Sequence, residues 1–426
     1  MKRFLFLFLL IIVFSSPALA GGFMVGEMAT RSTGMGSAFT AVSDDASAAW
    51  HNPAGVAFTS GKQLMLGGDI ILTKNEFSSN SSTKGVGGVP ITNAVKGKDG
   101  TFFVPHAYMT YQDDSSKLGG SLSINSPFGL ETDWPATAAF SSKNTFSRLN
   151  MVIINPSLVY KVSDNFSLAA GVDYAYMFKV DLNNTIQNLT GSGDGIGGNA
   201  SLFYKGDAFN FGVTYRSSIK INVDGTATAN PLGPLAAGGS SAATTSVTLP
   251  DQLNVGVAMM PNDQWIVSLD ADWVNWKKFK SIDITYASAL YRTVLSGVQA
   301  AIFAPVTGST SLPQNWKATV DLRLGAEWKY SSNMRARFGY VFSPSPITDV
   351  DFAPSIPGND RHLFSVGYGY DMNPETTLDL GYAYVMIKDR NQTQSPLTPL
   401  GSPGSVKNGN YKGSANILMA SVNHRF

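Results

Sequence analysis

The stretch Asn165–Leu182, NFSLAAGVDYAYMFKVDL, alternates between apolar and polar or small residues. Its apolar positions share one face: Phe166, Leu168, Ala170, Val172, Tyr174, Tyr176, Phe178 and Val180. The other face carries Ser167, Gly171, Asp173, Lys179 and Asp181. A half-buried sandwich strand also alternates, but Gly, Ser, Asp and Lys on the second face suit a wet lumen. We therefore predict a strand that spans a membrane with lipid on one side and water on the other.

The same alternation recurs along the chain, for example in residues 209–218, 317–330 and 377–386. Fourteen such segments begin near Lys62, Thr101, Lys117, Arg148, Asn165, Gly197, Ala208, Val247, Asp263, Trp316, Asn333, Arg361, Glu375 and Ser414. Short turns between them alternate with long connections such as residues 74–100, 218–246 and 277–315. This rhythm is typical of outer-membrane barrels. We expect a 14-stranded antiparallel β-barrel over residues 62–426, with both chain ends on the periplasmic side.

The two ends of the chain point to the compartment. Lys2 and Arg3 precede an apolar run over residues 4–14 and a small-x-small cleavage site at residues 18–20, so we interpret residues 1–20 as a secretory signal peptide. The run is too short for a membrane anchor. The last residues, ANILMASVNHRF, alternate and end on Phe426. Such an ending is typical of the signal read by the barrel-assembly machinery, and we expect the Gram-negative outer membrane.

Composition argues against several other classes of protein. There is no cysteine, so neither a disulfide framework nor a thiolate metal site is available. The net charge is +1 and only 14% of residues are charged, which gives no support to nucleic-acid binding. The four histidines lack metal-ligand spacing, and no Ser-His-Asp set is recognisable. We expect no enzymatic activity, no cofactor and no metal, and a monomer.

Residues 21–61 do not fit the strand pattern. They are rich in glycine and small polar residues and have little sustained apolar character. Irregular backbone cannot face lipid, because its amide groups would go unpaired. The segment therefore lies either in the periplasm as a tail or inside the lumen, and composition does not choose between these positions.

A family resemblance makes that choice. Residues 21–55, GGFMVGEMATRSTGMGSAFTAVSDDASAAWHNPAG, resemble the N-terminal hatch of the long-chain fatty acid and hydrocarbon transporter family (the FadL/TodX type). The shared motifs are Gly22-Phe23, Gly34–Ala38, Asp44-Asp45 and Asn52-Pro53-Ala54. The likeness continues through residues 123–134, 217–226, 249–257, 263–276 and 355–368. It implies a barrel plugged by residues 21–61, the segment we call the hatch.

The resemblance also implies a function. Hydrophobic substrate is caught outside, passes to a pocket beside the hatch and leaves sideways through a gap in the wall, which avoids exposing apolar surface to water at about 25 cal/mol per Å². The expected substrate-binding residues of the hatch are Gly22, Phe23, Asn52, Pro53 and Ala54. Fatty acids and monoaromatic or alkane hydrocarbons both remain candidates. A general porin or an outer-membrane lipase are the alternatives, and lipopolysaccharide is an expected partner.

A gap in the wall is expected after the third predicted strand. Its alternation breaks at Asn125-Ser126-Pro127, followed by Phe128-Gly129. Proline cannot donate to the sheet ladder and belongs at an edge or a bulge. The strand either ends there in an outer loop or is kinked so that the wall opens, and the resemblance favours the kink.

Five cations are predicted to face the lumen: Lys179, Arg216, Lys317, Arg323 and Arg361. Each can pair with a lumen acid and only stabilise the interior. A fatty acid carboxylate, however, requires a desolvated cation in its pocket. By strand position Lys179, Lys317 and Arg361 are the candidates, although Arg361 lies in a family-like segment that could instead hold the hatch.

Five tryptophans lie near predicted strand ends: Trp134, Trp265, Trp273, Trp276 and Trp316. Aromatic girdles occupy such positions at membrane interfaces. We therefore interpret these residues as interfacial anchors.

Overall fold

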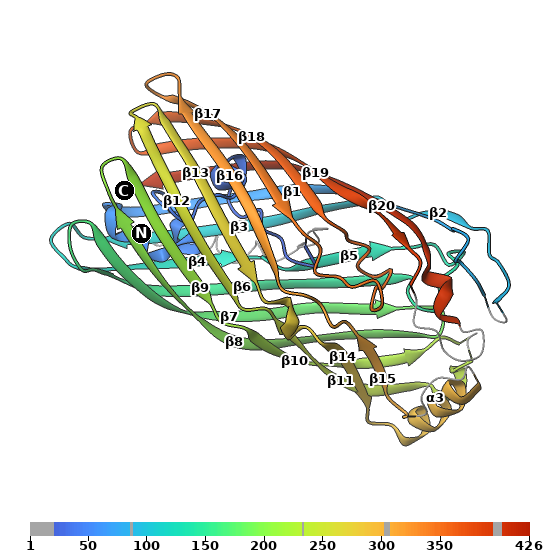
Figure 1. Cartoon of the computed structure of the whole chain (residues 1–426). Helices are drawn as coiled ribbons and strands as arrows, with labels where there is room; N and C mark the ends of the chain where they lie inside the picture. The colour runs from blue at the N-terminus through green and yellow to red at the C-terminus, as the bar shows by residue number, and fades with distance from the viewer. Residues whose placement is uncertain (1–20, 86–87, 232–233, 302–306, 395–402) are drawn as a thin grey trace.

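A computed structural model describes residues 21–426 except 86–87, 232–233, 302–306 and 395–402, so the predicted signal peptide lies outside the described residues. The strands form one antiparallel sheet (Figure 1). It closes because β1 (Gly61–Ser78) pairs with both β3 (Gly100–Gln112) and β20 (Gly409–Arg425). No helix in the described part of the chain is long and apolar enough to cross a membrane.

The described strands fill fourteen positions in the wall, which confirms the predicted barrel. Single strands occupy ten positions: β1, β3, β6 (Phe146–Lys161), β7 (Phe166–Asn183), β8 (Gln187–Lys205), β16 (Thr319–Lys329), β17 (Met334–Ser343), β18 (Arg361–Asn373), β19 (Thr376–Gln392) and β20. Two successive strands share each of the other four: β4 (Leu118–Asn125) with β5 (Gly129–Asp133), β9 (Phe209–Arg216) with β10 (Ile219–Ala229), β11 (Ser240–Leu249) with β12 (Gln252–Asn262), and β13 (Trp265–Val274) with β14 (Ser281–Tyr286). The remaining elements belong to connections: β2 (Ala94–Lys96), β15 (Thr310–Pro313), α3 (Ala289–Ala301), η3 (Ala236–Gly238), η4 (Trp276–Lys278) and η5 (Pro403–Lys407).

The wall is taller than predicted at its outer end. Residues 218–246 were expected to form one long connection, but they contain β10 and most of β11. Their outward residues, such as Lys220 and Asp224, are exposed and polar. Here the outward face carries polar residues, whereas Ile221 and Val223 are buried on the inward face, so the lipid-facing apolar alternation that marks a spanning strand is reversed.

The alternation of β7 is the expected one in the lower wall. Leu168, Val172 and Tyr174 are exposed, whereas Asp173 and Ala175 are buried inside. Asp173 accepts a hydrogen bond from Arg216 at 2.7 Å. The polar face therefore meets other polar groups in the lumen, and the apolar face is left for lipid.

The hatch lies inside the barrel (Figure 1, blue). It contains three short helices, α1 (Thr30–Gly34), α2 (Ala48–His51) and η1 (Pro53–Phe58). Its backbone is bonded to the wall: the Thr40 N–H donates to Asp270 at 2.8 Å, and Thr214 donates to the His51 carbonyl at 3.0 Å. Of the two positions left open by composition, the lumen is correct.

A buried ion network joins the hatch to the wall. Glu327 on β16 accepts from Arg31 of the hatch at 2.9 Å and from Arg337 on β17 at 2.6 Å. Arg337 also donates to Asp379 on β19 at 2.5 Å. All four side chains are at most 11% exposed, so each charge depends on its partners for compensation.

Close approach of hatch and wall requires Gly339. A Cβ at Gly339 would lie 1.9 Å from the Gly36 nitrogen of the hatch. We expect Gly339→Ala to lower the free energy of unfolding by about 1–3 kcal/mol, as overpacking does, and to expose the hatch to limited proteolysis. Gly120→Ala is the matched control, because its Cβ would meet its nearest atom, the Ser157 carbonyl oxygen, at 3.6 Å. Equal protection of the hatch in both variants would contradict the prediction.

Candidate functional site

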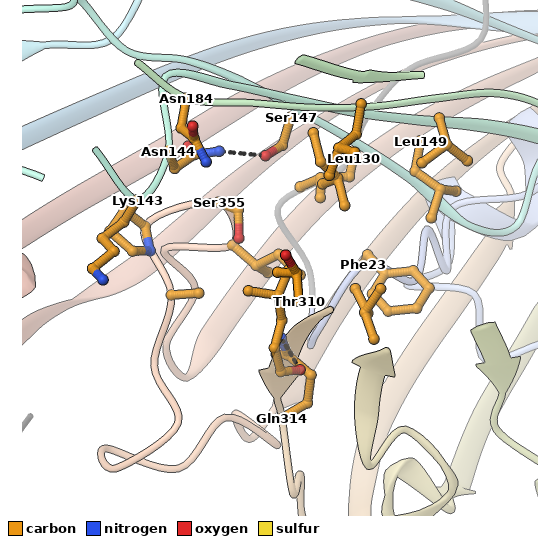
Figure 2. Close-up of a pocket in the computed structure, with 18 of the residues that line it drawn as sticks. Phe23, Leu130, Lys143, Asn144, Ser147, Leu149, Asn184, Thr310, Gln314 and Ser355 are labelled. Carbon is orange, nitrogen blue, oxygen red and sulfur yellow. Dashed lines mark hydrogen bonds between the residues drawn. The ribbon is translucent and has the colours of Figure 1, made fainter. Parts of the chain in front are cut away.

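A cavity of about 420 Å³ lies at the outer end of the barrel, among the long connections (Figure 2). Apolar side chains from several strands and connections line it: Leu130, Leu149, Val180, Leu182, Leu189, Val223, Val247, Ile282, Phe352 and Ile356. Its volume falls in the range of small-molecule sites, which are mostly apolar with a few placed polar groups. The cavity is therefore suited to a ligand with an apolar body.

Phe23 of the hatch forms one side of this cavity (Figure 2). Its ring packs edge-on against Trp276 and Phe279, with centroids 5.0 and 5.2 Å away, and lies 5.8 Å from Trp316. Gly22 precedes it with φ of 73°, and a Cβ there would lie 2.5 Å from Trp316. The left-handed backbone and the lack of a side chain let this part of the hatch fit into the aromatic cluster.

The prediction of a tryptophan girdle is wrong for Trp134, Trp276 and Trp316. All three are buried inside the barrel, and Trp134 donates to the Pro354 carbonyl at 2.9 Å. The segments that carry them fold inward over the lumen after leaving the wall, so their place near a strand end does not predict the face. Trp265 does lie on the wall, stacked on Trp328 of the paired strand.

Two lysines line the cavity, and Figure 2 shows Lys143 on the side opposite Phe23. In the described part of the chain neither Lys143 nor Lys407 forms a salt bridge. Lys407 donates to the Phe352 carbonyl at 2.6 Å. Burial lowers the pKa of Lys143. Burial is also the main cause that lowers the pKa of Lys407 to about 8; Lys143 adds to this shift and Asp351 opposes it. The site therefore presents two cations beside an apolar surface, the half-buried Lys407 and the more exposed Lys143.

The sequence did not identify these two lysines. Both lie in connections, where no periodic pattern indicates which way a side chain points. The sequence feature that could have indicated them is a cation in an outer connection, and many surface lysines have this feature.

None of the three cations that were expected to bind a substrate carboxylate, Lys179, Lys317 and Arg361, lines the cavity. A bulge on β7 between Met177 and Val180 reverses the alternation, so Val180 lines the cavity and Lys179 lies on the other face, 3.4 Å from Asp181. Lys317 is exposed. Arg361 is buried, with Nη1 3.0 Å from Oε1 of Glu27 in the hatch, which fits the alternative role of holding the hatch.

The Asn52-Pro53-Ala54 turn joins the hatch to the wall away from the cavity. Asn52 donates to the carbonyls of Thr40 and Leu202, both at 3.0 Å, and Ser167 donates to the Ala54 carbonyl at 2.6 Å. Pro53 is buried beside them. A direct role of this turn in substrate binding stays a prediction; its contacts position the hatch.

The wall is interrupted where the kink was predicted. β3 pairs with β4 only from Ala107 onward, and β5 pairs with β6 alone. Among the described residues, 100–106 of β3 therefore have no strand partner on this side; we call this edge the wall interruption. Asn125 ends β4, and Ser126 is buried between β4 and Pro127.

The first described residues of the hatch pair with the kinked chain at this point. Val25 donates to the Pro127 carbonyl at 2.8 Å, Gly129 donates to the Phe23 carbonyl at 2.9 Å, and Met24 bridges to Phe128. The kinked segment thus turns inward and contacts the hatch rather than ending in an outer loop. Phe23 therefore both lines the cavity and accepts a hydrogen bond from the kinked segment.

A family model described as "Outer membrane protein transport protein (OMPP1/FadL/TodX)" matches residues 11–426. The chain is 23% identical to the long-chain fatty acid transport protein of Escherichia coli K12 over 424 residues, covering 87% of this chain and 89% of that one. It is 24% identical to outer membrane protein P1 of Haemophilus influenzae, covering 87% and 86%.

Solved structures share the fold. A FadL homologue of Pseudomonas aeruginosa superposes with a TM-score of 0.76 at 18% identity, covering 95% of this chain and all of that chain. The Ralstonia pickettii toluene transporter TbuX gives a TM-score of 0.67 at 18% identity, covering 94% and 99%.

Proposed function

Because the chain belongs to the outer membrane protein transport family (OMPP1/FadL/TodX), we propose that it imports long-chain fatty acids across the outer membrane. The observation that carries this proposal is the pairing of an apolar cavity with two lysines in its lining, the half-buried Lys407 and the more exposed Lys143. The cavity takes the hydrocarbon tail, and the ammonium groups take the carboxylate.

The lysines favour a fatty acid over a hydrocarbon. Burying an apolar tail gains about 25 cal/mol per Å² for either cargo, so the cavity alone does not discriminate. A carboxylate gains charge-assisted hydrogen bonds from Lys143 and Lys407, whereas an alkane or a monoaromatic leaves both cations without a counter-charge. Among the relatives, the Escherichia coli protein is named for long-chain fatty acids and TbuX for toluene.

The proposed route runs from the outer connections to the cavity and then sideways through the wall interruption. Phe23 links the two, since it lines the cavity and its carbonyl is bonded to Gly129 of the kink. Displacement of this segment would open a path from the cavity to the lipid. Delivery into hydrocarbon keeps the tail out of water along the whole path.

The other candidate functions have weaker support. A general porin requires an open lumen, but the hatch fills it and is bonded to several strands. We propose no enzymatic role, since the relatives are named as transport proteins or channels. We further propose that the chain is monomeric, is surrounded by lipopolysaccharide and is assembled through the strand that ends at Phe426.

The proposal is tested by comparing ligands that differ only in the head group. Purified protein in detergent is titrated with palmitic acid, its methyl ester and hexadecane, and the dissociation constants are compared. We expect palmitic acid to bind most tightly. Equal affinities for the acid and the ester would contradict the proposal, and a large steady conductance in planar bilayers would favour the porin.

Binding of the acid is expected to depend on pH through Lys407. Its pKa of about 8 means that the ammonium is present below this pH and is lost above it, while the ligand carboxylate stays charged. We expect palmitate affinity to fall by about tenfold as pH rises through about 8, because a charge-assisted hydrogen bond is worth about 1.5 kcal/mol or more. In Lys407→Arg the decline should vanish, since guanidinium stays protonated. An unchanged decline in that variant would show that another group is responsible.

A further inference from the structure

A second group of polar side chains lies below the wall interruption, on the inner face of four neighbouring strands. We call it the polar patch; its members are Asp69 on β1, His106 and Tyr108 on β3, Ser123 and Asn125 on β4, and Ser421 on β20. The strand register brings them together, because Ser421 and His106 both pair with Gly67, and Tyr108 pairs with Ser123. Each of them is at most 3% exposed.

The polar patch has unused hydrogen-bonding capacity. Both carboxylate oxygens of Asp69, both ring nitrogens of His106 and both amide atoms of Asn125 lack a hydrogen-bond partner among the described residues. The hydroxyls of Tyr108, Ser123 and Ser421 lack one as well. The nearest approach of His106 to Asp69 is 4.0 Å, too long for a hydrogen bond. Buried polar groups are normally paired, so these buried side chains have donors and acceptors available for a polar group that enters the barrel at this point.

The patch adjoins the wall interruption. The last residue pair between β3 and β4 is Ala107 with Ile124. His106 and Asn125 are the next residues along the two strands, so they border the wall interruption. Further along β3 the inner face becomes apolar, where Val104 packs in a cluster with Val25 and Met28 of the hatch. The wall interruption is therefore bordered by polar side chains at one end and by apolar side chains further along β3. This arrangement matches an amphiphilic ligand, which has a polar head group and an apolar tail.

The charged groups in and near the polar patch indicate which kind of ligand head group it can bind. Asp69 is its one carboxylate, and the patch contains neither lysine nor arginine. Glu27 of the hatch adds a further carboxylate nearby, but its own counter-ion is Arg361 at 3.0 Å. Since the patch has neither lysine nor arginine, an anionic head group would be buried there without a counter-charge. A neutral group that both donates and accepts can bond to the carboxylate of Asp69 and to the amide of Asn125.

We propose that the polar patch binds the uncharged head group of an amphiphile, a hydroxyl or a protonated carboxyl, while its tail lies in the wall interruption. The inference rests on the proposed function for the route to this site. A fatty acid held as an anion by Lys143 and Lys407 would take one proton from the aqueous phase and reach the patch as the neutral acid. Its O–H would donate to Asp69, and its carbonyl oxygen would accept from Asn125.

The test measures transfer of palmitic acid, cetyl alcohol and hexadecane into liposomes that contain the full-length protein. The variant Ser123→Ala/Asn125→Leu removes donors and acceptors from the patch, and heat-modified gel mobility checks that the barrel has folded. We expect transfer of the acid and the alcohol to fall about tenfold and that of hexadecane to stay unchanged. The matched control is Ser268→Ala on β13, whose buried hydroxyl also lacks a hydrogen-bond partner among the described residues. It should behave like the wild type.

Infrared spectroscopy of carboxyl-labelled palmitic acid gives a direct readout. We expect a protonated-carboxyl band in the wild type that weakens in Asn125→Leu and persists in Lys143→Met/Lys407→Met at saturating ligand. Bound acid seen solely as carboxylate, or a parallel loss of hexadecane transfer, would overturn the polar-patch inference. Failure of the wild type to bind palmitic acid while it transfers cetyl alcohol through the patch would instead overturn the proposed fatty acid function.

Discussion

Replacing both Lys143 and Lys407 with methionine is expected to weaken palmitate binding by about 100-fold. Each ammonium can donate a charge-assisted hydrogen bond worth about 1.5 kcal/mol to the ligand carboxylate, and about 1.4 kcal/mol corresponds to a tenfold change in affinity. Methionine keeps an unbranched stem in the cavity wall, so the apolar contacts of the tail are retained. Hexadecane binding should therefore stay within about twofold of the wild type, or become tighter as desolvated charge is removed.

The matched control for this experiment is Lys388→Met/Lys412→Met. Both lysines are more than half exposed on the outer face of the wall and pair with surface acids. The control removes the same number of charges from the same end of the barrel, so it tests whether general attraction of the anion explains the effect. Equal losses in the two double variants would contradict a specific carboxylate site.

Arg337→Met is expected to lower the free energy of unfolding by about 3–5 kcal/mol. The side chain is 1% exposed and is the salt-bridge partner of the buried Asp379. Removing one member of a buried ion pair leaves the other charge uncompensated, at a cost of this size. Urea titration of the protein in detergent, followed by tryptophan fluorescence, measures the loss.

Arg335→Met serves as the control for Arg337→Met. Arg335 lies two residues away on the same strand. Its two terminal nitrogens donate to the two carboxylate oxygens of Asp371, at 2.8 Å each, and its contact with Glu327 of the buried network is long, at 3.9 Å. Its side chain and that of Asp371 are both over a fifth exposed, so the pair should contribute about 1 kcal/mol or less. A loss in Arg335→Met as large as that in Arg337→Met would show that burial of the network is not the cause.

Sequence patterns and motifs pointed to some residues at the candidate site and misplaced others, and each outcome has a physical reason. Phe23 and the kink at Asn125–Gly129 followed motifs that resemble the family, and the structure bonds them to each other. Lys179 was assigned to the wrong face because a single bulge shifts the alternation, and such a bulge has no distinct signature in this strand. Arg361 was expected to face the lumen, and the structure places it beside Glu27 of the hatch, a partner that lies more than 300 residues away in sequence.

By itself the sequence determined the barrel of this protein: the period-2 alternation and the rhythm of short and long connections are enough for fourteen antiparallel strands, whereas the place of the hatch in the lumen was expected from the family resemblance alone. These signals are local, because lipid and water on opposite faces impose the same requirement on every spanning strand. The tertiary structure alone decided which cations face the cavity and which polar groups border the wall interruption. Lys143, Lys407, His106 and Asn125 acquire their surroundings from chain segments that closure of the barrel brings together, and no periodicity along the chain encodes such contacts.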